Sequence, residues 1–167
     1  MADNENKDMQ VLGIKTVEEE IVNEERVITF RLNNELVGID INDITKITKD
    51  VEITPVPKTK EYILGVMNLR GNILPVVSLK KMFHLEDREE DYESPVVIVV
   101  ETDLGQIGTT VDKIEGAVKI SPDDIQPPPM NAIGIDPEYI KGVVMLPDDL
   151  LILLDIKKIF KKEDKNG

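Results

Sequence analysis

The chain contains one stretch of sequence twice, and this duplication constrains its fold more than any other feature. Residues 62–83 and 139–160 align at an offset of 77 without a gap, and 9 of the 22 positions are identical. A weaker similarity at an offset of 70 relates residues 27–44 to residues 97–114, so the second copy carries about seven extra residues in one loop. Such a repeat predicts two similar packed units with a groove between them, where a partner can bind.

Alternating apolar residues predict short β-strands in both copies. Residues 27–32 and 35–41 alternate around an Asn33-Asn34 turn, which indicates a β-hairpin. Similar strands and turns recur along both copies, and each copy ends in a short predicted helix, over residues 80–85 and 157–162. This pattern predicts an all-β protein built from barrels or sandwiches, and about five strands per copy are enough for a small closed barrel.

The predicted organisation has five segments. They are an acidic, mostly disordered tail over residues 1–25, a first barrel over 26–85, an acidic linker over 86–93, a second barrel over 94–162 and a short tail over 163–167. Units of about 65 residues are marginal alone, so we expect the two units to share an interface or exchange strands.

The net charge of −13 is concentrated in two short segments. Residues 1–25 carry −6 and residues 86–93 carry −5, which leaves −2 for the rest of the chain. We expect both segments to be solvated, partly disordered chain. Acidic segments repel a phosphate backbone, so the expected partners are proteins and not nucleic acids.

The composition also bears on the compartment. No run of 18 apolar residues predicts a membrane span, the N-terminus lacks the basic and apolar regions of a secretion signal, and the chain has no cysteine. We therefore expect a cytoplasmic protein that does not insert into the membrane.

The sequence offers little catalytic chemistry. His84 is the only histidine, and with no cysteine present it cannot anchor a structural zinc site, so we expect it on the surface. The acid pairs Asp123-Asp124 and Asp148-Asp149 fall in predicted turns or helix caps, where aspartate is common. No phosphate-binding glycine motif is present. We expect a protein that is not an enzyme and needs no cofactor; a small-ligand binding protein that uses the cleft between the barrels is the alternative.

Two features do not fit a simple core pattern. The apolar residues Ile41, Ile44 and Ile47 are spaced by three, so a regular strand cannot bury all of them on one face. Either a bulge allows all three to be buried, or an apolar spot lies on the surface. Arg70 lies in a predicted turn where its repeat partner is Pro147. Its guanidinium is either exposed, or folded back to pin a loop, or available to a protein partner.

The stretch Gly65–Leu79, which includes the element NLRG followed by Pro75, resembles the CheW family of bacterial chemotaxis coupling proteins. Four further stretches support the resemblance, which runs from about Arg26 to Phe160: Val37–Ile41, Ile53–Pro57, Gly108–Asp112 and Leu151–Phe160.

The resemblance implies a scaffold with two five-stranded barrels similar to Src-homology-3 (SH3) domains. Such proteins link the cytoplasmic tips of chemoreceptors to the regulatory domain of the histidine kinase CheA, and the receptor hairpin docks in the groove between the barrels. Two near-equivalent barrel ends would face the kinase and support arrays at the inner face of the membrane.

The resemblance also implies roles for individual residues. The receptor groove would contain Ile41, Ile44, Ile47, Val111 and Ile114, and Arg70, which matches a family arginine, would belong to the same protein-binding surface. Some relatives pair that arginine with a glutamate where this chain has Lys46, so the pair does not carry over and the role of Arg70 stays open. Four glycines that match family glycines are expected at turns or bulges: Gly65, Gly71, Gly108 and Gly142.

Overall fold

The computed structural model of the chain describes residues 24–129 and 134–161. The predicted tail over residues 163–167 and nearly all of the tail over residues 1–25 lie outside these ranges. The strands are β1 (Glu25–Leu32), β2 (Glu35–Asp40), β3 (Ile44–Lys49), β4 (Ile63–Leu69), β5 (Asn72–Ser78), β6 (Val96–Thr102), β7 (Gly105–Val111), β8 (Lys113–Ile120), β9 (Ile140–Met145) and β10 (Leu150–Leu154). The helices are α3 (Leu79–Met82) and α4 (Ile156–Ile159), with short 3-10 turns η2 (Ile41–Asp43), η3 (Glu89–Tyr92), η4 (Pro122–Asp124) and η5 (Pro137–Tyr139).

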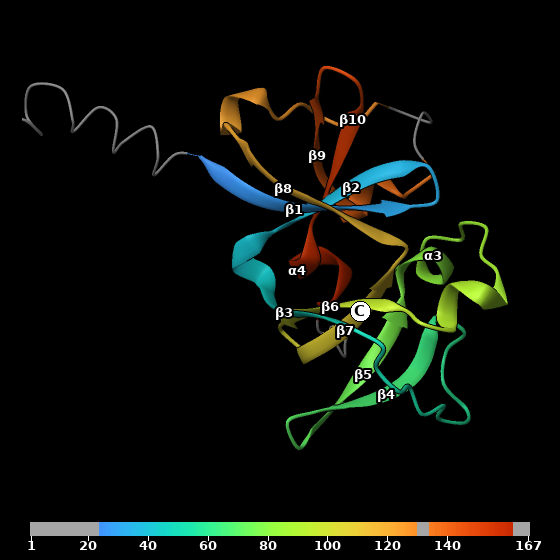
Figure 1. Cartoon of the computed structure of the whole chain (residues 1–167). Helices are drawn as coiled ribbons and strands as arrows, with labels where there is room; N and C mark the ends of the chain where they lie inside the picture. Colours follow the sequence, from blue (N-terminus) through green and yellow to red (C-terminus); the bar gives the residue numbers. More distant parts are fainter. Residues whose placement is uncertain (1–23, 130–133, 162–167) are drawn as a thin grey trace, which may run out of the picture.

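The strands form two five-stranded sheets, as Figure 1 shows. Sheet A has the order β8-β1-β2-β10-β9, and sheet B has the order β3-β6-β7-β5-β4. The all-β fold of two small SH3-like units is therefore confirmed.

The predicted barrel boundaries are wrong, because each sheet takes strands from both copies of the repeat. The β1–β2 hairpin of the first copy joins β8, β9 and β10, and the β6–β7 hairpin of the second copy joins β3, β4 and β5. Parallel pairing joins the copies: Leu153 of β10 lies opposite Gly38 of β2, and Val76 of β5 lies opposite Gly108 of β7. Segments 26–85 and 94–162 thus exchange hairpins, which buries more surface than two separate small units would.

Two equivalent bridges connect the outer strands of each sheet. Thr54 pairs with Val66 through two backbone hydrogen bonds of 2.9 Å, and Gln126 pairs with Val143 through two of 2.8 Å. These bridges link the chain after β3 to β4 and the chain after β8 to β9, which removes open sheet edges. The extra residues of the second copy include some between Gln126 and Val143, as the sequence predicted.

The family glycines serve close packing as well as turns. Gly71 lies in the β4–β5 turn with φ +86°, and Gly65 lies at a bulge with φ +149°. A Cβ at Gly142 would overlap the Ile125 side chain beside the second bridge. Gly108 lies within β7 with no turn or bulge, so that expectation is wrong; its Cβ would lie 2.9 Å from the Val97 side chain.

The apolar residues divide into three cores. A small core in sheet A includes Val27 and Leu151, and a small core in sheet B contains their repeat partners, Val97 and Leu74. The largest core takes residues from both sheets and from α4, such as Ile156. Strand β6 therefore buries both of its faces, since alternate side chains point to opposite sides. The shared core fixes the two sheets against each other.

Candidate functional site

The chain crosses between the sheets at two equivalent places, and the predicted groove residues lie there. The turn η2 carries the chain from β2 in sheet A to β3 in sheet B. Residues 111–113 carry it back from β7 in sheet B to β8 in sheet A. Ile41 and Ile44 flank the first crossing, and Val111 and Ile114 flank the second. The candidate residues thus come from two points of the junction between the sheets.

The broken alternation at the first crossing has two physical causes. Residues 41–43 leave the strand as a 3-10 turn, which the Asp40 carboxylate caps by accepting a hydrogen bond of 2.9 Å from the Asn42 backbone N–H. A bulge then follows between Ile44 and Lys46, where β3 pairs with β6. The spacing of three therefore reflects both a bulge and an exposed apolar spot, two readings that the sequence left as alternatives.

The five groove candidates differ in exposure. Ile41 is 40 % exposed and Ile47 is 37 % exposed, whereas Val111 is 4 % exposed and belongs to the shared core. Ile44 and Ile114 are half-buried and pack against that core. Only Ile41 and Ile47 are exposed enough for a partner to contact much of their surface.

Charged groups border the exposed isoleucines. Burial of the Asp43 carboxyl group raises its pKa, and the negative charge of nearby Asp40 raises it further. The positive charges of Lys141 and Lys157 act to lower it, but they do not outweigh these two causes. Apolar side chains surrounded by polar groups are typical of a protein-binding surface.

Arg70 is not part of this junction. It is exposed in the turn between β4 and β5 with φ +51°, and Lys46 lies in β3, at the other end of the strand order of sheet B. Among the described residues, no ion pair involves Arg70. Its position favours an exposed role over a pinned loop.

An apolar cleft of about 420 Å³ lies elsewhere between the two halves. It is lined by residues of β4, β5, β7, α3 and α4 and by Tyr62 and Phe160, which lie just outside β4 and α4, but by none of the five groove candidates. Among the described residues that line this cleft, Lys161 is the one with a charged side chain. The cleft therefore offers little of the convergent polar chemistry that a specific small-ligand site needs.

The sequence missed a polar cluster around Lys80. A cavity of about 620 Å³ is lined by Asn33, Lys80, Asp91, Asp112 and neighbouring residues of the acidic segment. Residues 86–93 were expected to be solvated linker, but they contain η3 and bind the body through ion pairs. A pair of lysines shortly before a segment with six acidic residues was the available signal in the sequence.

Three expectations remain, which concern the exposure of His84, a metal site and a membrane-spanning helix. His84 is exposed, as predicted. Within residues 24–129 and 134–161, no three His, Cys, Asp or Glu side chains lie close enough together to hold a metal ion. No helix in these two ranges is long and apolar enough to cross a membrane.

Comparisons with known proteins agree with this geometry. The family model of the CheW-like domain matches residues 26–164. The chemotaxis protein CheW of Treponema pallidum is 37 % identical over 149 residues, covering 86 % of this chain and 87 % of that protein. The CheW of Klebsiella aerogenes is 34 % identical over 155 residues, covering 91 % and 92 % of the two chains. The crystal structure of the scaffolding protein TtCheW from Thermoanaerobacter tengcongensis has a TM-score of 0.74 and 34 % identity, covering 86 % of this chain and 97 % of that one.

Proposed function

This chain belongs to the CheW-like domain family, the coupling scaffolds of chemotaxis signalling, and from that premise we propose which partners it holds and with which surfaces. It binds the cytoplasmic tip of a chemoreceptor at the junction between the sheets and the regulatory domain of the histidine kinase CheA at the sheet ends. It acts in the cytoplasm, at receptor arrays on the inner face of the membrane, and catalyses no reaction itself.

The observation that carries the receptor site is the pair of exposed isoleucines at the first crossing. Ile41 and Ile47 keep 40 % and 37 % of their surface exposed beside a half-buried Ile44. The receptor tip is a helical hairpin whose apolar face fits such a surface in a helix-in-groove mode. Covering the exposed part of each side chain contributes about 1 kcal/mol.

The kinase surface is supported by two exposed apolar residues, which belong to the same cross-strand pair of two equivalent hairpins. Ile73 of the β4–β5 hairpin is 63 % exposed, and Met145 of the β9–β10 hairpin is 69 % exposed. Ile73 lies opposite Asn68, and Met145 lies opposite Leu150, at the corresponding position of the repeat. One apolar side chain per sheet gives two similar faces, which suit a partner that is itself built like this chain and allow ring formation.

Arg70 belongs to the kinase-facing surface in this proposal. It lies in the turn of the same β4–β5 hairpin that carries Ile73. An exposed guanidinium at the rim of an apolar contact is suited to bind a carboxylate of the partner.

Binding measurements with two matched variants test the proposal. In calorimetric titrations, the full chain is mixed separately with a receptor-tip fragment and with the CheA regulatory domain. Ile47→Asp places a carboxylate in the groove and is expected to weaken receptor binding at least about tenfold while leaving kinase binding unchanged. Ile73→Asp, the same substitution on another exposed strand position of sheet B, is expected to do the reverse.

Two results would count against the proposal. If the unmodified chain binds neither partner at about 50 µM, where micromolar affinity gives nearly full occupancy, the coupling role fails. If Ile47→Asp and Ile73→Asp weaken both partners equally, the two surfaces are wrongly assigned. Ile47 is a better probe than Ile44, because Ile44 also packs against the shared core and its loss would disturb folding.

A further inference from the structure

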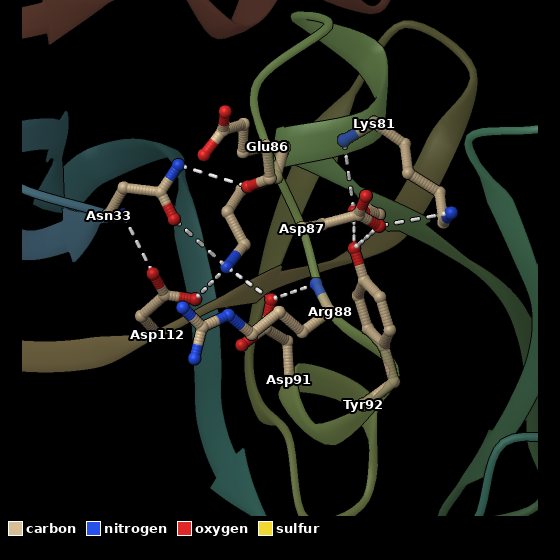
Figure 2. Close-up of polar contacts among 10 residues, drawn as sticks. Asn33, Lys81, Glu86, Asp87, Arg88, Asp91, Tyr92 and Asp112 are labelled. Atoms are coloured by element: carbon tan, nitrogen blue, oxygen red, sulfur yellow. Dashed lines mark hydrogen bonds and ion pairs between the residues drawn. The ribbon is translucent and has the colours of Figure 1, made fainter.

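A single buried cation connects three separate parts of the chain. The Lys80 side chain in α3 is 5 % exposed, and its Nζ lies 2.6 Å from Oδ2 of Asp91 and 2.7 Å from Oδ1 of Asp112. It also donates a hydrogen bond of 3.3 Å to the side-chain oxygen of Asn33. Asn33 lies in the β1–β2 turn of sheet A, Asp91 in η3, and Asp112 at the second crossing between the sheets. Figure 2 shows the side chains of Asn33, Asp91 and Asp112 gathered from these different elements.

The acidic segment 86–93, here called the strap, has further attachments on both sides. The Asn33 side-chain amide donates to the Glu86 carbonyl at 3.0 Å, and the Asn33 backbone N–H donates to Asp112 at 2.7 Å. Within the strap, Asp87 accepts a hydrogen bond of 2.8 Å from the Tyr92 hydroxyl and lies 3.0 Å from Lys81 Nζ (Figure 2). The strap therefore binds the turn of sheet A and the helix α3 of sheet B at the same time.

The charges in this cluster stabilise one another. Burial acts to lower the pKa of Lys80, but its hydrogen bonds to Asp112 and Asp91 outweigh burial and raise it. Burial likewise acts to raise the pKa of Asp91, but the hydrogen bonds from Lys80 and from the Arg88 backbone N–H outweigh it and lower the pKa. Lys80 and Asp91 are therefore both charged at neutral pH, and removing the single cation leaves the carboxyl groups of Asp91 and Asp112 without their shared partner.

The other copy of the repeat lacks this cluster in its described residues. Lys157 occupies the position in α4 that Lys80 occupies in α3, but it is exposed. At an offset of 70, Asp112 corresponds to Asn42, which has no carboxylate. The cluster is thus not a simple product of the duplication, and Lys157 is a natural control for Lys80.

We propose that Lys80, Asp91 and Asp112 are positioning residues that lock sheet A to sheet B at the second crossing. Through this lock they hold the groove in the geometry that passes the state of the receptor to the kinase. Both partners still bind when the lock is broken, because their contact residues are elsewhere, but the two binding events are no longer coupled. The inference rests on the proposed coupling function for its activity readout, whereas the lock itself is tested by structural measurements alone.

The test compares Lys80→Met, which removes the cation, with Lys157→Met, the same change at the equivalent exposed position. Hydrogen exchange is measured on the full chain. Lys80→Met is expected to raise the exchange rates of the backbone amides of the strap and of Asn33 at least about tenfold. Its affinity for the receptor-tip fragment and for the CheA regulatory domain is expected to stay within about threefold of the unmodified chain. Receptor-dependent activation of CheA is expected to fall at least about fivefold, and Lys157→Met is expected to leave the exchange of the strap and of Asn33 unchanged.

Two further variants separate a positioning role from a general loss of stability. Lys80→Arg keeps the charge, and the 620 Å³ cavity beside Lys80 has room for a guanidinium, so this variant is expected to restore activation. Asp91→Asn carries the test if Lys80→Met does not fold, because Asp91 lies in the strap and outside both sheets.

Particular outcomes would overturn the inference. If the strap amides of Lys80→Met or Asp91→Asn exchange fast but the variant still supports full activation of CheA, the lock does not serve coupling. Unchanged exchange in both variants would show that there is no lock. If the unmodified chain binds neither partner while the exchange results hold, the proposed function fails and the lock is shown to be structural only.

Discussion

The closure of sheet B at Gly65 gives a quantitative test of the fold. A Cβ on Gly65 would overlap the carbonyl oxygen of Thr54 and lie 2.6 Å from its carbonyl carbon and 2.9 Å from the Cα of Pro55. All three are backbone atoms, so no side-chain rotation relieves the overlap. The φ of +149° at Gly65 adds strain for any other residue.

The expected loss in Gly65→Ala follows from these contacts. The overlap must lengthen or break the two hydrogen bonds of 2.9 Å between Thr54 and Val66. At about 1 kcal/mol for each bond and about 1 kcal/mol for the backbone strain, the free energy of unfolding falls by about 3 kcal/mol. For a chain of this size that corresponds to a drop in Tm of about 10 °C.

Thermal and urea unfolding of the full chain measure this loss, with Gly71→Ala as the matched control. Gly71 also has a positive φ, of +86°, but its Cβ would meet no atom within 4 Å. Gly71→Ala therefore keeps the strain without the overlap and is expected to lose only about 1 kcal/mol. Equal losses in the two variants would refute the reasoning that the bridge at Thr54 closes the sheet.

Two further predictions concern the strap and the shared core. Asp91→Asn is expected to lower the free energy of unfolding by about 2 kcal/mol at pH 7, since it breaks a mostly buried pair with Lys80. Because the folded state lowers the pKa of Asp91, its contribution is present above the unfolded pKa of about 4 and is lost as the pH falls through the lowered value. The difference between variant and unmodified chain should therefore shrink toward zero in urea titrations below about pH 4, and a constant difference would contradict it. Ile152→Ala removes a fully buried side chain from the shared core and is expected to lose about 3 kcal/mol, whereas Met145→Ala at an exposed position should lose less than about 0.5 kcal/mol; similar losses would argue against the shared core.

The sequence predicted the strands well, because their signals are local. The alternation around Asn33-Asn34 gave the β1–β2 hairpin, and the repeat located the equivalent turns and short helices. Ser121 and Asp136 cap the turns η4 and η5 by accepting hydrogen bonds from the backbone N–H groups two positions later, which is also a local signal.

The exchange of hairpins could not be predicted in the same way. The alternation of β2 is the same whether its neighbour is β5 or β10, since both copies carry the same apolar pattern. The parallel pairing of Gly38 with Leu153 joins residues that are more than a hundred positions apart, and no local pattern encodes it. The irregular spacing from Ile41 to Ile47 marked the crossing, but it did not reveal which sheet the chain enters.

The strap was misread for a different physical reason. Six acidic residues among eight are typical of solvated chain, and charge counting has no means to detect that a buried lysine holds one of them, Asp91, against the body. For the groove, the resemblance supplied the residues, but only the structure distinguishes the exposed Ile41 and Ile47 from the buried Val111.

The most direct test of the scaffold claim is the activity of CheA with receptor tips, measured with and without the full chain. If the chain couples the two, CheA phosphorylation should respond to the receptor fragment only when the chain is present, and Ile47→Asp should reduce the response at least about tenfold. A response of equal size without the chain, or one that Ile47→Asp leaves intact, would contradict the account.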